Sequence, residues 1–284
     1  MESGKPSYMA DRTARLRAAH QLLDDDPKIL ADPLAVSLYG GNTESDIQED
    51  LEFLQKPVLR RARTFMVVRA RYTEDQLTEA IKRGIEQFVI LGAGLDTFAY
   101  RCAESVKNLR IFEVDHPDTQ RWKLAKLKAA QIGIPAHLRH IGVDFERHSL
   151  ADKLTAGGFD AAAPAFFSWL GVSYYLERHA VFSMFAFIAN MPPPSQIVFD
   201  YLLDETLLDE KSRASVSSAR RETDTHGEPL RTRFVPRDLQ AELQKIGFRK
   251  VARLTSQDAT QLYLSGRRDG LSLDASLQLM SAIV

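Results

Sequence analysis

The sequence lacks the features that define several large classes of protein. Cys102 is the only cysteine, which excludes a disulfide framework and favours a reducing compartment. The 37 basic residues nearly balance the 38 acidic ones, so no strong field would attract nucleic acid or an anionic membrane. No apolar run approaches the length of a membrane span, and residues 1–6 lack the apolar segment of a secretory signal. We therefore expect a cytoplasmic protein, whose 284 residues suit one large α/β domain or two small ones.

A short apolar run that ends in a glycine turn is the most informative pattern present. Residues 88–91 (FVIL) lead directly into Gly92, Ala93 and Gly94. A buried strand followed by such a turn opens the nucleotide pocket of doubly wound α/β sheets, because glycine lets the backbone approach the ligand closely. About twenty residues later, Asp115 ends a second apolar run, where a carboxylate can accept hydrogen bonds from both hydroxyls of a ribose. Together these features predict a site for a cofactor that carries adenosine.

The glycine pattern alone leaves the type of cofactor open. A complete dinucleotide fingerprint has a third glycine, which lets a pyrophosphate rest on the helix N-terminus, and Thr97 occupies that position. S-adenosylmethionine carries a ribose but no phosphate and does not need this glycine. The sequence therefore favours S-adenosylmethionine over NAD or FAD, and the absence of a Tyr-x-x-x-Lys pair points the same way. A nicotinamide-dependent oxidoreductase and a turn that only joins strand to helix are the alternatives.

From residue 88 onward the sequence alternates between strand-like and helix-like segments. We expect strands at 88–91, 109–114, 137–143, 165–169 and 196–201, with helices at 117–131 and 177–190. This order predicts a parallel sheet with helices on both faces. A helix from residue 236, closed by Gly247, and two antiparallel strands at 248–254 and 261–267 would complete it. The predicted fold is therefore the Rossmann-like, mostly parallel, seven-stranded α/β sheet of class I methyltransferases.

We expect the whole chain to form one methyltransferase domain. Its parts would be an N-terminal helical cap, a cofactor-binding core, a lid, and a C-terminal helix with a strand pair, at residues 1–87, 88–203, 204–235 and 236–284. The first part shows helical patterns and no convincing strand, with helices expected at 13–23, 32–39 and 49–83. The third part is polar and mixed in charge, so it is either a lid over the pocket or a solvated insertion.

Several short motifs, in order, resemble the leucine carboxyl methyltransferase-like family of S-adenosylmethionine-dependent O-methyltransferases. Bacterial and actinobacterial members of this family include polyketide carboxyl methyltransferases. The matching segments are LGAGLDT at 91–97, YR at 100–101, EVDHP at 113–117, VDF at 143–145, GVSYYL at 171–176 and GEP at 227–229. The resemblance extends over about residues 13–270. It implies direct SN2 transfer of a methyl group to a carboxylate or hydroxyl of a small acceptor.

The resemblance also implies roles for residues around the cofactor. Gly92, Ala93 and Gly94 would line its methionine part, and Asp115, with His116 beside it, would hold the ribose hydroxyls. Further along the chain, Asp144 and Phe145 would bracket the adenine.

Two arginines and one leucine complete the implied cofactor site. Arg71 matches the arginine that pairs with the cofactor's carboxylate, which a guanidinium can bind with two parallel hydrogen bonds. Arg17 lies where the family often has a second basic contact, although either arginine could instead form a surface ion pair. Leu170 stands where many members have a glutamate that helps to fix the cofactor. This departure keeps a third alternative open, a relative that binds the cofactor without turnover.

Methyl transfer from a sulfonium depends mainly on aligning the nucleophile, the methyl carbon and the sulfur. A carboxylate acceptor is already ionised at neutral pH, whereas a phenol or alcohol requires a base. No side chain is clearly placed as that base: His116 and His179 suit structural roles, and His137 and His140 would point to opposite faces of a strand. Without a cluster of His or Cys, we expect no metal site.

Contacts with the acceptor should come from elements that roof the cofactor. The predicted catalytic residues are Tyr174, Tyr201 and Arg220, with Tyr175 and Arg221 as further candidates. Each tyrosine could instead belong to the core, and each arginine could be solvated. The expected partner is a small-molecule carboxylic acid or phenol, with no nucleic acid or membrane. A homodimer remains open, as does a protein substrate, because one branch of the family methylates a protein C-terminus.

Overall fold

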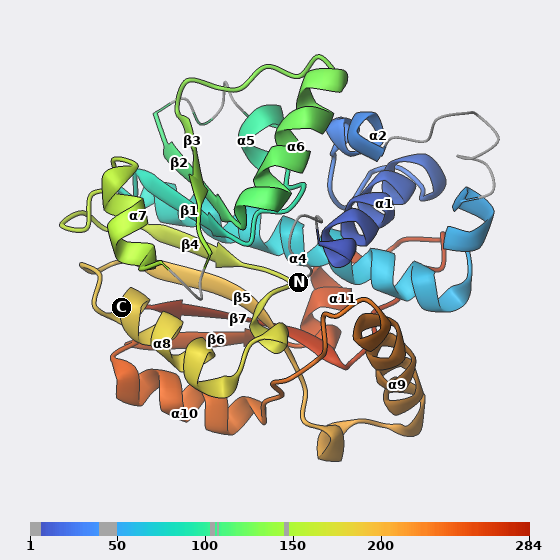
Figure 1. The fold of residues 1–284 in the computed structure, drawn as a ribbon. Helices are drawn as coiled ribbons and strands as arrows, with labels where there is room; N and C mark the ends of the chain where they lie inside the picture. The colour runs from blue at the N-terminus through green and yellow to red at the C-terminus, as the bar shows by residue number, and fades with distance from the viewer. Residues whose placement is uncertain (1–6, 40–49, 103–105, 107, 145–147) are drawn as a thin grey trace.

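A seven-stranded sheet forms the centre of the protein. The computed structural model describes residues 7–39, 50–102, 106, 108–144 and 148–284 of the chain. The strands lie in the order β3-β2-β1-β4-β5-β7-β6 (Figure 1). Their bounds are β1 (Gln87–Leu91), β2 (Arg110–Asp115), β3 (Leu138–Gly142), β4 (Phe166–Trp169), β5 (Gln196–Leu202), β6 (Lys250–Leu254) and β7 (Leu277–Ile283). Strands β1 to β5 are parallel, and β7 runs antiparallel to both of its neighbours. The predicted class I methyltransferase sheet is confirmed.

The sheet is buried on both faces, which is why its central strands are apolar runs without polar alternation. Every residue of β1, β4 and β5 is buried. Successive side chains of β1 enter different cores: Val89 and Leu91 pack on one face, and Phe88 and Ile90 on the other. The first face is covered by α7 (Leu150–Ala156), α8 (Arg178–Ala189) and α10 (Pro236–Ile246). The second is covered by α4 (Pro57–Lys82), α5 (Phe98–Arg101), α6 (Pro117–Ala129) and α11 (Ser256–Tyr263).

The N-terminal region is helical, as predicted. It contains α1 (Tyr8–Leu23), α2 (Pro33–Tyr39) and α4, and α1 packs against both of the others. The helix expected at 49–83 is interrupted before Pro57, because proline starts a new helix more readily than it continues one. Buried Arg63 joins these helices by hydrogen bonds to both carboxylate oxygens of Asp24, at 2.9 and 2.7 Å.

One predicted strand was wrong. Residues 261–267 form the end of α11 and the turn after it, and the second antiparallel strand is β7. A capping box explains the helix: the Thr255 side chain accepts from the Asp258 N–H, while the Asp258 carboxylate accepts from the Thr255 N–H. Three short helices, α5, α7 and α11, were not predicted.

The polar segment after β5 contains a 3-10 turn at Glu205–Leu207 and then α9 (Glu210–Thr225). Figure 1 shows α9 beside the N-terminal helices rather than beneath the sheet. Among the described residues, we find no helix with the length and apolar character needed to cross a membrane.

Candidate functional site

The turn after β1 is held so tightly that only glycine fits its first position. The N–H groups of Gly92 and Ala93 both donate to the carbonyl of Val114, at 2.8 and 3.1 Å, which fastens the turn to β2. Gly92 has a φ of +71°, and a Cβ on it would lie 2.4 Å from Cγ2 of Val172. Backbone conformation and close approach therefore both require glycine here. The segment after β4 lies directly against the turn.

Asp115 and the turn are brought together, as the sequence predicted. Its Oδ2 accepts from the N–H of Gly94 at 2.6 Å, and its Oδ1 accepts from the N–H of His116 at 2.7 Å. Burial raises the pKa of Asp115, while these two hydrogen bonds act in the opposite sense. His116 caps α6, with Nδ1 accepting from the N–H of Asp118 at 3.2 Å. On the other side of the turn, a Cβ on Gly94 would lie 3.3 Å from Cβ of Ala10 in α1.

This arrangement fits a cofactor that carries a nucleoside. The glycine turn brings the backbone close to the carboxylate of Asp115 at the end of β2, and a carboxylate at that place suits ribose hydroxyls. Asp144 lies two residues beyond β3, at the same edge of the sheet, because β3 pairs in parallel with β2. Phe145, the other residue expected at the adenine, lies outside the described residues.

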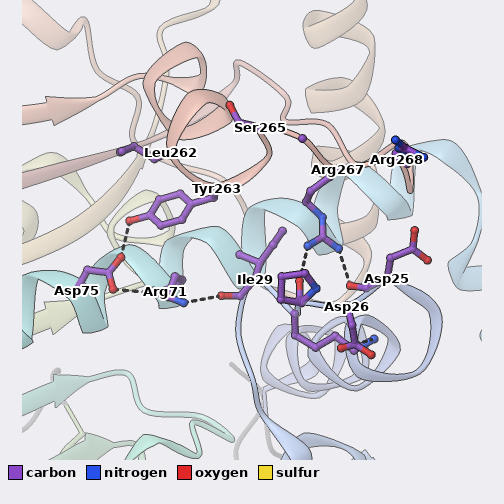
Figure 2. A pocket seen from close by; sticks show the side chains of 13 residues that line it. Asp25, Asp26, Ile29, Arg71, Asp75, Leu262, Tyr263, Ser265, Arg267 and Arg268 are labelled. Atoms are coloured by element: carbon purple, nitrogen blue, oxygen red, sulfur yellow. Dashed lines mark hydrogen bonds and ion pairs between the residues drawn. The ribbon is translucent and has the colours of Figure 1, made fainter.

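The structure does not bring Arg71 to the glycine turn. Its side chain is 46% exposed, with Nε 2.9 Å from Oδ1 of Asp75 and Nη1 3.3 Å from the carbonyl of Ile29. It faces a pocket of about 620 Å³ between α4, residues 25–29 and residues 262–268 (Figure 2). Polar groups there already pair with one another, since Tyr263 also donates to Asp75, at 2.9 Å.

Arg69 is the arginine of α4 that lies against the segment after β4. Residues two apart on a helix point in nearly opposite directions, so Arg69 faces away from the pocket that Arg71 lines. Its Nη1 lies 2.7 Å from Oδ2 of Asp200, and a Cβ on Gly171 would lie 3.1 Å from its Nη2. Sequence reasoning missed Arg69. The available signal was its position in register with Phe65 and Thr73 on the buried face of the helix.

Polar contacts anchor the segment after β4 near Leu170. Asp200, at the end of β5, accepts from the N–H of Gly171 at 2.7 Å through Oδ1, and its carbonyl accepts from the Ser173 hydroxyl at 2.6 Å. Burial raises the pKa of Asp200, against the effect of Arg69. Leu170 itself is partly buried against the core beneath α4. Leu170 is therefore adjacent to a buried arginine–aspartate pair.

The three predicted catalytic residues occupy different environments. Tyr174 is buried beside Arg69 and Tyr175, and burial raises the pKa of its phenol. Tyr201 is fully buried in the core, where its hydroxyl lies 3.4 Å from Oε1 of Gln278. Arg220 is exposed on α9. Of the three, only Tyr174 lies in the segment that packs on the glycine turn.

A buried network joins the N-terminal helices to the LDT motif. The Thr97 hydroxyl accepts from Nη2 of Arg17 at 2.6 Å and donates to Oδ1 of Asp32 at 2.8 Å. Arg17 also pairs with Asp32 directly, and its Nη1 lies 3.7 Å from Oδ2 of Asp96. Burial acts to raise the pKa of Asp32, but Arg17 and Arg101 lower it overall. Arg17 therefore has a buried position at the cofactor side rather than a place at the surface.

Helix α9 is held against α1 at the same end of the site. The rings of Tyr8 and His226 stack with centroids 3.5 Å apart. Oε1 of Glu222 accepts from the Tyr8 hydroxyl at 3.2 Å and lies 3.2 Å from Nε of Arg12. Within the part of the chain that the structure describes, no group of His, Cys, Asp and Glu side chains is arranged to hold a metal ion.

Comparison with known proteins identifies the family. Residues 10–189 match the family model described as "Leucine carboxyl methyltransferase". The chain is 36% identical over 251 residues to the Bacillus subtilis protein described as "Putative S-adenosyl-L-methionine-dependent methyltransferase YktD", covering 87% of this chain and 82% of that one. A Mycobacterium tuberculosis protein of the same description, Rv0830, is 32% identical over 212 residues, covering 71% and 69%.

A solved structure supports the fold independently. The crystal structure of a "putative methyltransferase" from Thermobifida fusca superposes with a TM-score of 0.59 at 17% identity, covering 99% of this chain and 96% of that one. At this identity the likeness concerns the fold alone. The family model and the curated relatives establish that the chain belongs to the leucine carboxyl methyltransferase family and is an S-adenosyl-L-methionine-dependent methyltransferase.

Proposed function

We propose that this methyltransferase acts on the oxygen of a small-molecule acceptor, with a carboxylate as the preferred target. The observation that carries the cofactor part of the proposal is the joining of the glycine turn to Asp115 by the 2.6 Å hydrogen bond from Gly94. When bound, S-adenosylmethionine supplies an electrophilic methyl group with a neutral leaving group. The protein then has to orient the cofactor and the acceptor and exclude water, which can contribute roughly 7–11 kcal/mol.

Each part of the cofactor has a proposed partner. Asp115 accepts from the ribose hydroxyls, Asp144 from the adenine amino group, and the turn at Gly92–Gly94 lies along the methionine part. We assign the methionine carboxylate to Arg69 instead of Arg71, because Arg69 is buried and faces the segment that packs on the turn. Arg17, at Thr97, is placed to add a second positive charge.

The preference for a carboxylate acceptor rests on the state of the nearest candidate bases. Asp200 is already occupied by Arg69 and the Gly171 N–H, and the phenol of Tyr174 has a raised pKa. Neither group is suited to deprotonate a hydroxyl at neutral pH, whereas a carboxylate arrives ionised. In this proposal residues 1–87 form a cap, residues 88–203 the cofactor-binding core, residues 204–235 a lid, and residues 236–284 complete the sheet.

Calorimetric titration with S-adenosylmethionine tests the cofactor site. We expect Asp115→Asn and Arg69→Lys to weaken binding by about 10- to 100-fold. The first removes a charge-assisted contact worth roughly 1.5–3 kcal/mol, and the second removes the two-point geometry of the guanidinium. Arg71→Lys is the matched control and should bind like the wild type. If Arg71→Lys weakens binding and Arg69→Lys does not, Arg71 is the residue that pairs with the methionine carboxylate. Binding of NADH in place of S-adenosylmethionine would contradict the proposal.

Product formation tests the acceptor. Formation of S-adenosylhomocysteine should be measured with a panel that pairs aromatic and aliphatic carboxylates with the corresponding phenols and alcohols. We expect turnover with carboxylates only. Turnover with phenols alone would overturn the carboxylate preference, and tight cofactor binding without any turnover would favour the relative that binds without catalysis.

A further inference from the structure

A buried polar cluster lies between the sheet and the helices beside Asp115. Lys123, from α6, places Nζ 2.6 Å from Oε2 of Glu113 on β2, and both side chains are 1% exposed. The Tyr100 hydroxyl lies 2.9 Å from Nε2 of His140 on β3 and 3.5 Å from Oε2 of Glu113. The other oxygen of Glu113, Oε1, is buried and has no hydrogen-bond partner among the described residues. The cluster is polar where an apolar core would be expected. Removing these groups from water costs free energy, so their presence requires an explanation.

The geometry directs this cluster towards Asp115. Glu113 and Asp115 are two residues apart on β2, so their side chains leave the same face of the sheet. Helix α6 begins at Pro117, directly after Asp115 and its neighbour, and brings Lys123 back over that face in its second turn. Nε2 of Gln120 donates to the carbonyl of Glu113 at 3.0 Å, which fixes α6 to β2. The buried ammonium of Lys123 therefore lies on the same face as two carboxylates, the buried Glu113 and the partly buried Asp115.

The positive charge of Lys123 acts on both carboxylates of β2. Burial raises the pKa of Glu113 to about 7, although Lys123 acts to lower it. Burial also raises the pKa of Asp115, and Lys123 again acts in the opposite sense. His140 stays neutral in this range, because burial lowers its pKa to about 4. The groups facing the cluster from the surrounding elements are Asp96, Tyr100, His116 and His140.

We propose that Lys123 is a positioning residue for cofactor binding, which holds Asp115 ionised and aimed at the ribose from its buried place on α6. The inference rests on the proposed function, because it requires Asp115 to bind the ribose. Two apolar side chains in place of Glu113 and Lys123 would hold β2 and α6 together at least as well. An apolar pair would supply no charge to Asp115, and that difference separates the proposal from a purely structural role.

The test compares stability with binding of S-adenosylhomocysteine in three proteins. These are the wild type, Lys123→Met, and the double variant Glu113→Gln/Lys123→Met. Each is unfolded with urea, and its dissociation constant for S-adenosylhomocysteine is measured by calorimetry from pH 5.5 to 8.5. Lys123→Met leaves Glu113 without a counter-charge and should lose stability. The double variant removes the stranded carboxylate and should recover most of that stability.

Binding should not recover in the double variant. We expect its dissociation constant at pH 6 to be about 10-fold or more above that of the wild type, and to approach the wild-type value as the pH rises and Asp115 ionises. Lys128→Met, which changes an exposed lysine of the same helix, should match the wild type throughout.

Two outcomes would overturn the inference. If the double variant binds like the wild type at every pH, the pair is structural only. If its affinity is reduced equally at pH 5.5 and 8.5, the loss does not act through the ionisation of Asp115. A wild type that binds no S-adenosylhomocysteine would instead remove the proposed function, which is a distinguishable result. If Lys123→Met alone fails to fold, the double variant carries the test.

Discussion

Gly92 shows how a single position can combine two independent constraints. Its φ of +71° costs other residues roughly 1–2 kcal/mol, and a Cβ 2.4 Å from Val172 adds overlap worth roughly 1–3 kcal/mol more. We expect Gly92→Ala to lower the free energy of unfolding by the sum of both effects and to displace the segment after β4. Urea denaturation measures the loss of stability, and titration with S-adenosylmethionine measures how the displaced segment changes cofactor binding.

Gly158→Ala provides the matched control for Gly92→Ala. Gly158 has a φ of +91°, and a Cβ there would meet nothing within 4 Å. It should therefore show the backbone cost without the overlap. Equal losses in the two variants would mean that Val172 moves aside freely.

Glu113 and His140 give the protein opposing dependences on pH. The folded-state pKa of Glu113 is raised to about 7, above its unfolded value, so its contribution to stability falls as the pH rises from about 4.5 to 7. The folded-state pKa of His140 is lowered to about 4, so its contribution is lost as the pH falls from about 6.5 to 4. Between about pH 4.5 and 6.5 the two slopes offset each other.

Replacing His140 should therefore leave the contribution of Glu113 to dominate the dependence of stability on pH. We expect the free energy of unfolding of His140→Gln to fall by on the order of 2 kcal/mol from pH 4.5 to 6.5, while the wild type changes less. Urea denaturation at a series of pH values measures this. In Glu113→Gln the free energy of unfolding should instead rise with pH over this range. Parallel curves for all three proteins would show that the two residues do not offset each other.

At this scale the sequence located the backbone of the site better than its side chains. The turn at Gly92 and the acid Asp115 follow from strand ends, which fix position strongly. Arg71 was predicted at the cofactor, but it lies on the exposed side of α4, whereas Arg69 lies on the buried side. A short motif does not reveal which side of a helix is buried, because burial of α4 depends on helices remote in sequence. The sequence also did not show that the side chain of Tyr201 is buried in the core on the α8 and α10 face of the sheet.

Helix α9 is joined to α1 by exposed polar contacts and to the core by Val216. Glu222 accepts a hydrogen bond from Tyr8 and forms an ion pair with Arg12. Its side chain is 32% exposed, so each contact contributes roughly 0.5–1 kcal/mol. We expect the double variant Tyr8→Phe/Glu222→Gln to increase the rate of tryptic cleavage within α9 several-fold, because the undocked helix opens more often. Mass spectrometry of the fragments measures cleavage at Arg213, Arg220 and Arg221, which are exposed.

Glu242→Gln is a suitable control for this change in α9. It removes a similar exposed pair, with Lys245 at 3.0 Å, from α10 and should leave cleavage in α9 unchanged. If the double variant is cleaved at the wild-type rate, α9 is held by other contacts and the proposed lid is a fixed part of the structure.

Elements with long apolar runs were predictable, and those fixed by local capping were not. The five parallel strands and α8 were expected close to their observed bounds. Burial on both faces makes the central strands β1, β4 and β5 largely apolar. The segment 261–267 has alternating polar and apolar residues that imitate a strand. The capping box at Thr255 overrides that pattern by starting α11 at Ser256, five residues before Gln261.

At the scale of the whole molecule, the last strand of the chain, β7, completes the sheet. Strand β7 lies between β5 and β6 and pairs with both, so β6 reaches the sheet only through β7. The sequence predicted an antiparallel pair but not this insertion, because the order of strands depends on pairing across long separations. Residues close to the C-terminus therefore hold an interior position in the sheet.

A chain ending at Asp274 should lose the cooperative fold rather than a peripheral element. The truncation removes the buried side chains of Leu279, Met280 and Ala282 together with the ladders on both sides of β7. Burial of Leu279 and Met280 is worth roughly 1.5–3 kcal/mol each, and the unpaired edges of β5 and β6 add to the loss. The total approaches the roughly 5–15 kcal/mol that stabilises a typical domain. We expect no cooperative transition in urea, whereas removal of Val284 alone, which costs one hydrogen bond to Ser195, should preserve it. A cooperative transition in the truncated chain would show that β1 to β5 and their helices fold without the antiparallel pair.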